Sequence, residues 1–358
     1  MDKIFDIKEF EKLAQKKFSE EIMAFFSGGA GDEITLNGNI SDFDRIKLLP
    51  RVLKNVEDRS LSTTILNQQI DFPLLIAPMA FQRLAHPEGE IATAKAAEAN
   101  NIIMVTSTLS TCSFEEIKVT TTSSPWLQLY IYKDREITKN LVQLAESCGC
   151  QGIVLTVDTP LYGKRIKELH HPMVLPSDFE IKNLEIAGLN LKEIPLRKLP
   201  GHLASLLDPA IGWKDIDWLR SITSLPIILK GIINPKDMHI AIEHHIEAIV
   251  ISNHGGRQLD TTLSAIEALR LARSSSDTNI EIILDGGIRK GIDILKALAL
   301  GAKAVMIGRP ILWGLAVGGE EGVKAVLTIL KAEFDLAMAL CGYTSVNQIN
   351  EEILFFSH

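Results

Sequence analysis

The sequence predicts an α/β protein built around a (β/α)8 TIM barrel, and three observations carry this prediction. Eight short apolar segments follow one another from residue 73 onward. Most are apolar throughout, as expected for parallel strands that are covered on both faces. The stretches between them are helix-like and long enough for crossover connections. The expected strands are Leu74–Met79, Ile102–Ser107, Trp126–Ile131, Gly152–Asp158, Pro226–Gly231, Ala248–Asn253, Glu281–Gly286 and Ala304–Arg309.

Helices are expected between these strands, and a doubly wound open sheet is the alternative arrangement of the same elements. The alternative is disfavoured because no G-x-G-x-x-G motif follows the first strand. The best delimited helices are His86–Asn100, Lys133–Cys148, Pro235–His245 and Lys290–Leu300.

The remaining length is assigned to two additions within one domain, residues 1–358. Apolar residues at helical spacing indicate an N-terminal helical segment over residues 1–70, before the barrel at 71–358. Its glycine run at 28–31 lacks the strand and lysine of a P-loop, so a helix-ending turn is favoured. Strands four and five start 74 residues apart, against 22 to 33 elsewhere. This interval predicts an inserted loop over about 161–207, on the face where long loops serve as lids.

Composition excludes several classes of protein. The chain has 37 basic and 45 acidic side chains and a formal net charge of −8, which argues against a nucleic-acid partner. There is no apolar run long enough for a membrane span, no signal peptide and no C-terminal peroxisomal tripeptide. Four cysteines form no disulfide framework, and the histidine spacings suit no metal site. We expect a cytoplasmic protein with no membrane partner and no metal.

The loops after the last two strands predict a phosphate site. Barrel phosphate sites are commonly built there. Gly286, Gly287 and Gly308 let backbone N–H groups approach an anion. Arg289 and Arg309 add charge-assisted hydrogen bonds. The alternative is a pair of tight turns with surface arginines.

Other strand ends carry candidates for catalysis. Lys230 is either a salt-bridge partner, a cation beside a cofactor ring or a Schiff-base lysine. In the segment Ser252–Gln258, SNHGGRQ, His254 can act as a base and Arg257 can clamp a carboxylate. Asp158, at the end of the fourth strand, can orient the imidazole. Further candidates for recognising a hydroxyl and a carboxylate are Tyr130 and Arg165.

At these residues the chain resembles the FMN-dependent 2-hydroxy-acid oxidases and dehydrogenases, with the closest similarity to soluble glycolate and lactate oxidases. The signature is Ser252–Gln258, and the resemblance spans nearly the whole chain. The other matching segments are Ser27–Leu36, Leu75–Met79, His86–Glu90, Gln128–Arg135, Leu155–Pro160, Leu229–Gly231, Leu284–Gly291 and Ile307–Pro310.

The resemblance implies a role for each matching residue. His254 takes the substrate proton with Asp158 paired to it, while Tyr130 binds the hydroxyl. Arg257 and Arg165 bind the substrate carboxylate. The flavin ring and ribityl chain of FMN contact Pro78, Met79, Ala80, Ser107, Gln128, Thr156 and Ser252, with Lys230 near the ring's developing negative charge. The ribityl and phosphate end is held by Asp285, Gly286, Gly287, Arg289, Gly308 and Arg309.

Two features of the sequence bear on the substrate pocket, a departure from the family pattern at Phe25-Phe26 and the residue at position 109. Phe25 and Phe26 replace a Tyr-Tyr pair, so the hydroxyl that binds the substrate carboxylate is missing at Phe25. One lost hydrogen bond to a charged group costs about 1.5–3 kcal/mol. Leu109 stands where glycolate oxidases carry Trp. The missing hydroxyl predicts either a slow glycolate or lactate oxidase or a preference for a more apolar hydroxy acid. Leu109 predicts room for a side chain larger than the hydrogen of glycolate.

The resemblance therefore implies oxidation of an (S)-2-hydroxy acid (lactate, glycolate or a longer chain) to the 2-oxo acid, with O2 reduced to H2O2. The α-hydrogen passes to the flavin as a hydride or after carbanion formation. The alternatives are an FMN-dependent dehydrogenase and a tailoring enzyme or isomerase of the same fold; a flavin protein without turnover is a further one. A homo-oligomer, tetramer or octamer, is also implied.

Overall fold

The computed structural model describes residues 3–191, 193–275 and 280–356. The predicted domain also includes residues that lie outside this description, namely 1–2, 192, 276–279 and 357–358. Of these, residue 192 belongs to the predicted loop. Within the described ranges no helix is both long and apolar enough to cross a membrane. All four cysteines are buried and free.

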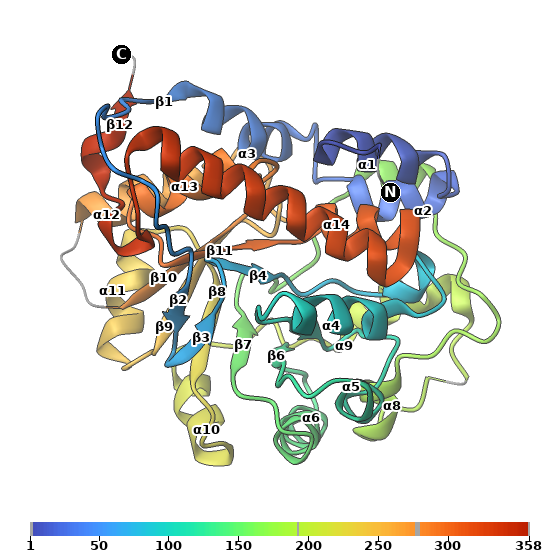
Figure 1. The fold of residues 1–358 in the computed structure, drawn as a ribbon. Coiled ribbons are helices and arrows are strands. Elements are labelled where there is room, and N and C mark those ends of the chain that lie inside the picture. Colours follow the sequence, from blue (N-terminus) through green and yellow to red (C-terminus); the bar gives the residue numbers. More distant parts are fainter. Residues whose placement is uncertain (1–2, 192, 276–279, 357–358) are drawn as a thin grey trace.

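Eight parallel strands form the centre of the molecule, in the order β4-β11-β10-β9-β8-β7-β6-β5 (Figure 1). A bridge between Ile76 and Met104 joins the two outer members and closes the ring. The predicted barrel is confirmed, and the open doubly wound sheet is excluded. The strands are β4 Leu74–Ile76, β5 Val105–Ser107, β6 Trp126–Leu129, β7 Ile153–Thr156, β8 Ile227–Ile232, β9 Ala248–Ser252, β10 Glu281–Asp285 and β11 Ala304–Ile307.

Most strands end one to three residues before the predicted limit, because the last predicted residues leave the ladder and form loops. Helices surround the barrel, and local capping explains where several begin. Ser113 and Glu116 form a capping box at α5, and Asp134 caps α6. The last helix, α14, kinks at Gly318 and Gly319. The barrel helices are α4 Gly89–Ala99, α5 Phe114–Thr120, α6 Arg135–Ser147, α10 Lys214–Ile222, α11 Pro235–Glu243, α12 Ala265–Ser275, α13 Gly291–Ala299 and α14 Arg309–Cys341.

A hairpin closes the amino-terminal end of the barrel. Its strands are β2 Thr63–Ile65 and β3 Gln68–Ile70. Leu66 and Asn67 have φ of 45° and 64°, as a tight two-residue hairpin turn requires. Ile65 and Ile70 are buried against the side chains that fill the barrel interior. The opposite, carboxyl-terminal end is therefore the open one.

The N-terminal segment is helical only as far as Arg45, so the expectation of a helical segment up to residue 70 was too long. After α1 Ile7–Gln15, α2 Glu20–Ser27 and α3 Ile34–Arg45 comes β1 Ile46–Leu48, then the hairpin. β1 pairs antiparallel with β12 Leu354–Phe356. These strands could not be predicted because three residues are too few to show an alternation of polar and apolar side chains. The partner of β1 also lies at the far end of the chain.

Hydrogen bonds fix this segment over the carboxyl ends of the strands. Asn39 of α3 and Asn253 exchange two side-chain hydrogen bonds of 2.8 Å. The Ala30 N–H donates to the Gly256 carbonyl at 2.8 Å. As predicted, α2 ends where the glycine run begins, with Gly28 as its C-cap. These contacts bring Phe25, at the end of α2, to the open end of the barrel.

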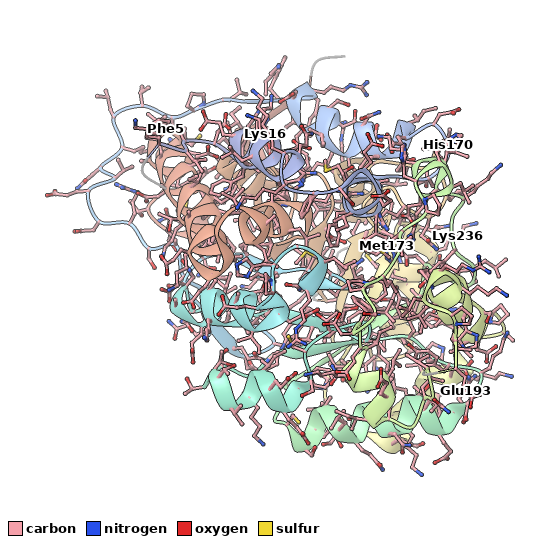
Figure 2. The ribbon with its side chains drawn as sticks, turned by 90° about the vertical axis from the view of Figure 1, so that its right-hand side faces the viewer. Phe5, Lys16, His170, Met173, Glu193 and Lys236 are labelled. Carbon is pink, nitrogen blue, oxygen red and sulfur yellow. The ribbon has the colours of Figure 1, made fainter. Side chains whose placement is uncertain are left out.

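A second cover comes from the long connection between β7 and α10, which contains α7 Ile166–His170, α8 Lys182–Ile186, a 3-10 turn at Leu196–Lys198 and α9 Leu199–Leu206. α7 packs against α2, so this connection meets the N-terminal segment. Figure 2 shows it from the side, where His170 and Met173 mark its course.

Candidate active site

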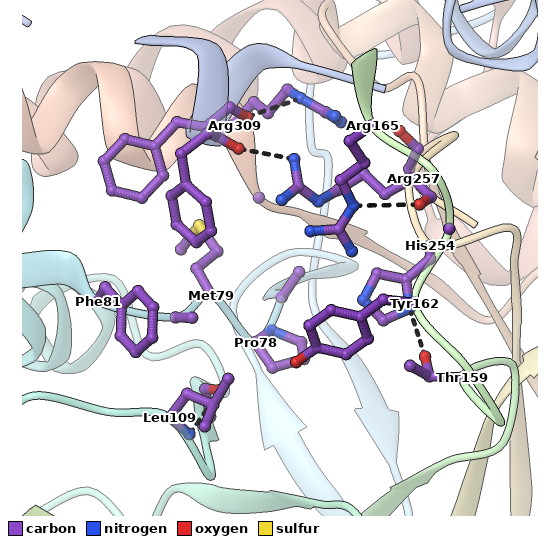
Figure 3. A pocket seen from close by; sticks show the side chains of 18 of the residues that line it. Pro78, Met79, Phe81, Leu109, Thr159, Tyr162, Arg165, His254, Arg257 and Arg309 are labelled. Carbon is purple, nitrogen blue, oxygen red and sulfur yellow. Dashed lines mark hydrogen bonds between the residues drawn. The ribbon is translucent and has the colours of Figure 1, made fainter. Parts of the chain in front are cut away.

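A cavity of about 460 Å³ opens at the carboxyl ends of the strands. Its wall combines strand ends with the N-terminal segment and the long connection (Figure 3). Asp158 and Ser252 stand one layer behind this wall, hydrogen-bonded to His254 and Lys230. The other predicted site residues line it: Phe25, Pro78, Met79, Ala80, Ser107, Leu109, Gln128, Tyr130, Thr156, Arg165, Lys230, His254, Arg257, Asp285, Gly286, Gly287, Arg289, Gly308 and Arg309.

His254 and Asp158 form a hydrogen-bonded pair. His254 Nδ1 lies 2.8 Å from Asp158 Oδ1. Because an ionised carboxylate only accepts hydrogen bonds, Nδ1 carries the hydrogen and Nε2 is left as the basic atom. Burial lowers the pKa of His254 below 6.5, although Asp158 opposes the shift. The imidazole is therefore neutral near pH 7 and ready to accept a proton at Nε2.

Asp158 is held as a carboxylate. Burial opposes its charge, but His254 and Lys230 hold the pKa of Asp158 below its ordinary value of 3.8. Its space depends on Gly231, which has φ of 112°. A Cβ added at Gly231 would stand 2.6 Å from the Asp158 Cβ. Glycine at this position therefore leaves room for the partner of the histidine.

Lys230 is a fixed positive charge in the cavity wall. It is 4 % exposed, and its Nζ lies 3.0 Å from Asp285 Oδ2 and 3.1 Å from Ser252 Oγ. Ser252 Oγ donates to Asp285 Oδ2 at 2.7 Å. Burial favours the neutral amine, but Asp285 and Asp158 raise the pKa of Lys230 above its ordinary value. A Schiff base needs a free amine, so the charge argues against that alternative.

Gln128 connects three adjacent strand ends through a buried network. Its Oε1 accepts from Ser107 Oγ and from the Thr108 N–H, each at 3.2 Å. Its Nε2 donates to Thr156 Oγ1 at 3.0 Å. The network fixes the amide against the cavity, where its atoms present a defined pattern of donors and acceptors.

Arg289 and Arg309 form a positively charged corner of the cavity, which favours an anion. Arg309 donates to the backbone carbonyls of Phe26, Gly28 and Gly255 at 2.9–3.1 Å. Among the described residues, no carboxylate forms an ion pair with either guanidinium. Burial and the neighbouring guanidiniums lower the pKa of Arg309 to about 9. An anion bound here would offset the cost of the two charges.

Two different constraints favour glycine in this corner, the backbone conformation and the space for a side chain. Gly286 and Gly287 have φ of 119° and 87°, which favours glycine. A Cβ at Gly287 would also overlap the backbone carbonyl of Asn39 in α3. A Cβ at Gly308 would stand 3.7 Å from Met79 and meet no close obstacle. The predicted reason, approach of backbone to an anion, is therefore joined at Gly287 by the packing of α3.

Arg257 and Arg165 lie side by side in the cavity wall (Figure 3). Arg165 Nε donates to the Arg257 carbonyl at 3.2 Å. Arg257 Nη1 donates to the carbonyls of Phe25 and Gly28 at 2.7 and 2.9 Å. Both guanidiniums approach one carboxylate oxygen, Glu168 Oε1, at 3.0 Å from Arg257 Nη2 and 3.3 Å from Arg165 Nη1. Two cations are thus gathered around a single acidic partner.

An apolar wall faces these arginines. Phe25 stacks on Phe81 with ring centroids 5.6 Å apart, and Phe81 meets Phe179 edge-on at 5.1 Å. Leu109 lines the same cavity, and its carbonyl accepts from the Phe81 N–H at 3.1 Å. Arg257 Cζ lies 5.3 Å from the centre of the Phe25 ring. The Phe25 ring therefore lies beside Arg257 without the hydroxyl that the tyrosine of the family pattern would carry.

Several wall residues escaped the sequence analysis. Phe81 follows a predicted strand end by only two residues, so extending the search past the strand would have found it. Tyr162 and Glu168 lie near Arg165 in the inserted loop and had no recognisable motif. Others come from parts of that loop far from any motif, such as Met173, Arg197 and Leu203.

Comparisons with known proteins identify the family of the chain. Residues 14–355 match the family model of the FMN-dependent dehydrogenases. The chain is 47 % identical to an L-lactate oxidase of Nostoc sp., covering 97 % of this chain and 96 % of the relative. It is 43 % identical to human 2-hydroxyacid oxidase 1, with 99 % and 97 % covered. A solved mandelate oxidase with (S)-4-hydroxymandelic acid superposes with a TM-score of 0.91, at 36 % identity and 98 % coverage of both chains. The chain therefore belongs to the FMN-dependent dehydrogenase family, with FMN as its cofactor.

Proposed function

We propose that this protein is an oxidase of (S)-2-hydroxy acids whose side chain is apolar and larger than the hydrogen of glycolate. The observation that carries the proposal is one cavity that joins the His254–Asp158 pair, two arginines and a wall of phenylalanines. The names of the relatives, L-lactate oxidase and 2-hydroxyacid oxidase, support the same reaction class.

The charged and polar residues present fit FMN. The corner of Arg289, Arg309 and Gly308 suits the phosphate, since neither guanidinium forms an ion pair with a carboxylate of the described residues and both donate to backbone carbonyls. Lys230 is a fixed positive charge in the cavity wall and would stabilise negative charge on a bound flavin ring. When bound, FMN supplies a two-electron acceptor that O2 reoxidises with formation of H2O2. The ring and ribityl chain are assigned to Pro78, Met79, Ala80, Ser107, Gln128 and Thr156, and the remaining polar contacts to Asp285, Gly286 and Gly287.

The substrate is held by charge at one end and by the apolar wall at the other. Arg257 and Arg165 bind its carboxylate, and Tyr130 faces the hydroxyl. His254 Nε2 takes the proton, because Nδ1 is committed to Asp158. The carboxylate of Asp158 then stabilises the imidazolium that forms. Ser252 acts behind this layer, where its hydroxyl holds Lys230 and Asp285 together and accepts the His254 N–H at 3.0 Å.

Anaerobic flavin bleaching tests the proposal. The purified protein is expected to be yellow and to lose its visible absorbance with L-lactate or longer 2-hydroxy acids, and more slowly with glycolate. Re-admission of air is expected to yield one H2O2 per flavin, and a dehydrogenase would instead reoxidise slowly. A flavin that no 2-hydroxy acid reduces would show the proposal to be wrong and favour a tailoring enzyme or isomerase.

Assembly is proposed from the resemblance, and location from the sequence. We infer a homo-oligomer, tetramer or octamer, which sedimentation of the holoenzyme tests. We also infer a cytoplasmic location, which imaging of a fluorescent fusion in the source cell tests.

A further inference from the structure

Glu168 is an acidic residue inside the cavity that the proposed reaction does not use. Its Oε1 lies 3.0 Å from Arg257 Nη2 and 3.3 Å from Arg165 Nη1, and its side chain is 26 % exposed. A carboxylate of the protein itself therefore forms ion pairs with the two arginines that are assigned to the substrate carboxylate. Both are neutralised in part before any substrate arrives.

The helix that carries Glu168 is tied down on both sides. Lys167 pairs with Glu33 at 2.7 Å, and His171 lies 3.5 Å from Glu20. Glu33 and Glu20 both belong to the N-terminal segment, and α7 packs against α2. Glu168 is thus held beside the arginines by the backbone around it.

The donors that remain on Arg257 are few. Both hydrogens of Nη1 go to the carbonyls of Phe25 and Gly28, and one hydrogen of Nη2 goes to Glu168. Nε and the second hydrogen of Nη2 have no partner among the described residues, and they are free for a ligand. A carboxylate that binds there sits beside Glu168 and is repelled by it.

We propose that Glu168 is a positioning residue that weakens the arginine pair for carboxylates, so that substrate and product exchange quickly. The inference rests on the proposed function, because it needs the arginines to bind the substrate. Substrate and 2-oxo acid product carry the same carboxylate, so tighter binding of that group does not raise the rate of the chemical step. It would instead slow the departure of the product.

Glu168→Gln tests this inference on the holoenzyme, since it removes the charge and keeps the shape. Titration with oxalate, which has no hydrogen on carbon to give up, is followed by the change in flavin absorbance. We expect the oxalate Kd to fall by roughly tenfold or more, because a like charge close to the bound anion is removed. KM for the hydroxy acid should fall in parallel, with kcat unchanged or lower through slower product release.

Glu180→Gln is the matched control. It removes an exposed carboxylate from the same long connection, and no ion pair of the described residues joins it to the arginines. Its oxalate Kd is expected to equal that of the wild type. Glu168→Asp keeps the charge but withdraws it by one methylene, so its Kd should lie between those of the wild type and Glu168→Gln.

An oxalate Kd that is unchanged or larger in Glu168→Gln overturns the inference. Glu168 would then strengthen carboxylate binding by the arginine pair or have no effect on it. If Glu168→Gln does not fold or retain flavin, Glu168→Asp decides, since the inference requires a Kd below that of the wild type. A wild-type flavin that no 2-hydroxy acid reduces contradicts the proposed function instead, so the two failures are distinct.

Discussion

The two sides of the cavity are made from different parts of the chain. The side assigned to FMN is formed by strand ends and the loops directly after them, with Lys230, Gln128 and Arg309 as its polar groups. The side assigned to the substrate combines strand-end residues such as Tyr130 and Arg257 with the N-terminal segment and the inserted loop, which bring Phe25 and Glu168. The barrel ladder fixes the first set, and packing between distant segments fixes the second.

This difference teaches where substrate preference can change. Strand-end groups such as Lys230 share hydrogen bonds with neighbouring strands, so moving one disturbs several. Phe25 makes only ring contacts with its side chain, and its hydrogen bond to Arg257 comes from the backbone. A substitution of its side chain can alter the pocket and leave the FMN side in place.

The largest effect is expected at His254, where the two sides meet. His254→Gln removes the proton acceptor and should slow anaerobic flavin reduction roughly 10²–10⁴-fold, with flavin content unchanged. Stopped-flow absorbance measures the rate. His239→Gln, an exposed histidine on α11, is the control and should keep the wild-type rate. Equal rates in the two variants would remove His254 from the mechanism.

A smaller loss is expected when the partner of His254 is displaced. Gly231→Ala places a Cβ 2.6 Å from the Asp158 Cβ at a φ of 112°. A misplacement of about 1 Å in such a pair costs on the order of 10²-fold in kcat. Gly149→Ala is matched in backbone strain, with φ of 85° and no atom within 4 Å of the added Cβ.

Both glycine variants should lose about 1 kcal/mol or more of stability from the strained φ, measured by thermal unfolding. Only Gly231→Ala should lose activity. A comparable loss of kcat in Gly149→Ala would show that strain alone, and not Asp158, is responsible.

On the FMN side, Arg309→Gln tests the anion corner. Loss of a charged hydrogen-bond donor costs about 1.5–3 kcal/mol, so FMN should bind roughly 10- to 100-fold more weakly. Reconstitution of the apoprotein followed by flavin fluorescence measures the Kd. Arg45→Gln, at an exposed arginine, should leave it unchanged. An unaltered Kd in Arg309→Gln would place the phosphate elsewhere.

On the substrate side, Phe25→Tyr restores the missing hydroxyl. KM for L-lactate should fall by roughly tenfold or more, because one hydrogen bond to a charged group, worth about 1.5–3 kcal/mol, is added. FMN affinity should not change. Phe5→Tyr, at an exposed phenylalanine, is the control. A higher KM in Phe25→Tyr would mean that the stack on Phe81 has reshaped the pocket.

The smallest effect is a pH shift. The base must be neutral, so kcat/KM falls as the pH drops through the pKa of His254. Burial lowers the pKa of His254, and the midpoint of the acid limb is therefore expected below 6.5. A pH profile of anaerobic flavin reduction measures it. A midpoint well above 6.5 would mean that Asp158 outweighs burial.

Sequence reasoning reached the FMN side further than the substrate side. The polar residues at strand ends could be predicted because apolar runs locate the ends and a barrel brings them to one face. Glu168 could not, since its role arises only when the inserted loop folds back onto Arg257. The place of Ser252 behind Lys230 was also out of reach, because adjacent strand-end residues point in different directions.

The pairing of β1 with β12 has a consequence for biosynthesis. Phe25 leaves the ribosome early, but the segment that holds it is anchored through β1 to residues 354–356. The N-terminal segment therefore lacks this anchor until the last strand has been translated. At roughly 5–20 residues per second, the nascent chain spends on the order of 15–70 s with β1 unpaired. Newly made protein thus acquires this anchor only at the end of synthesis.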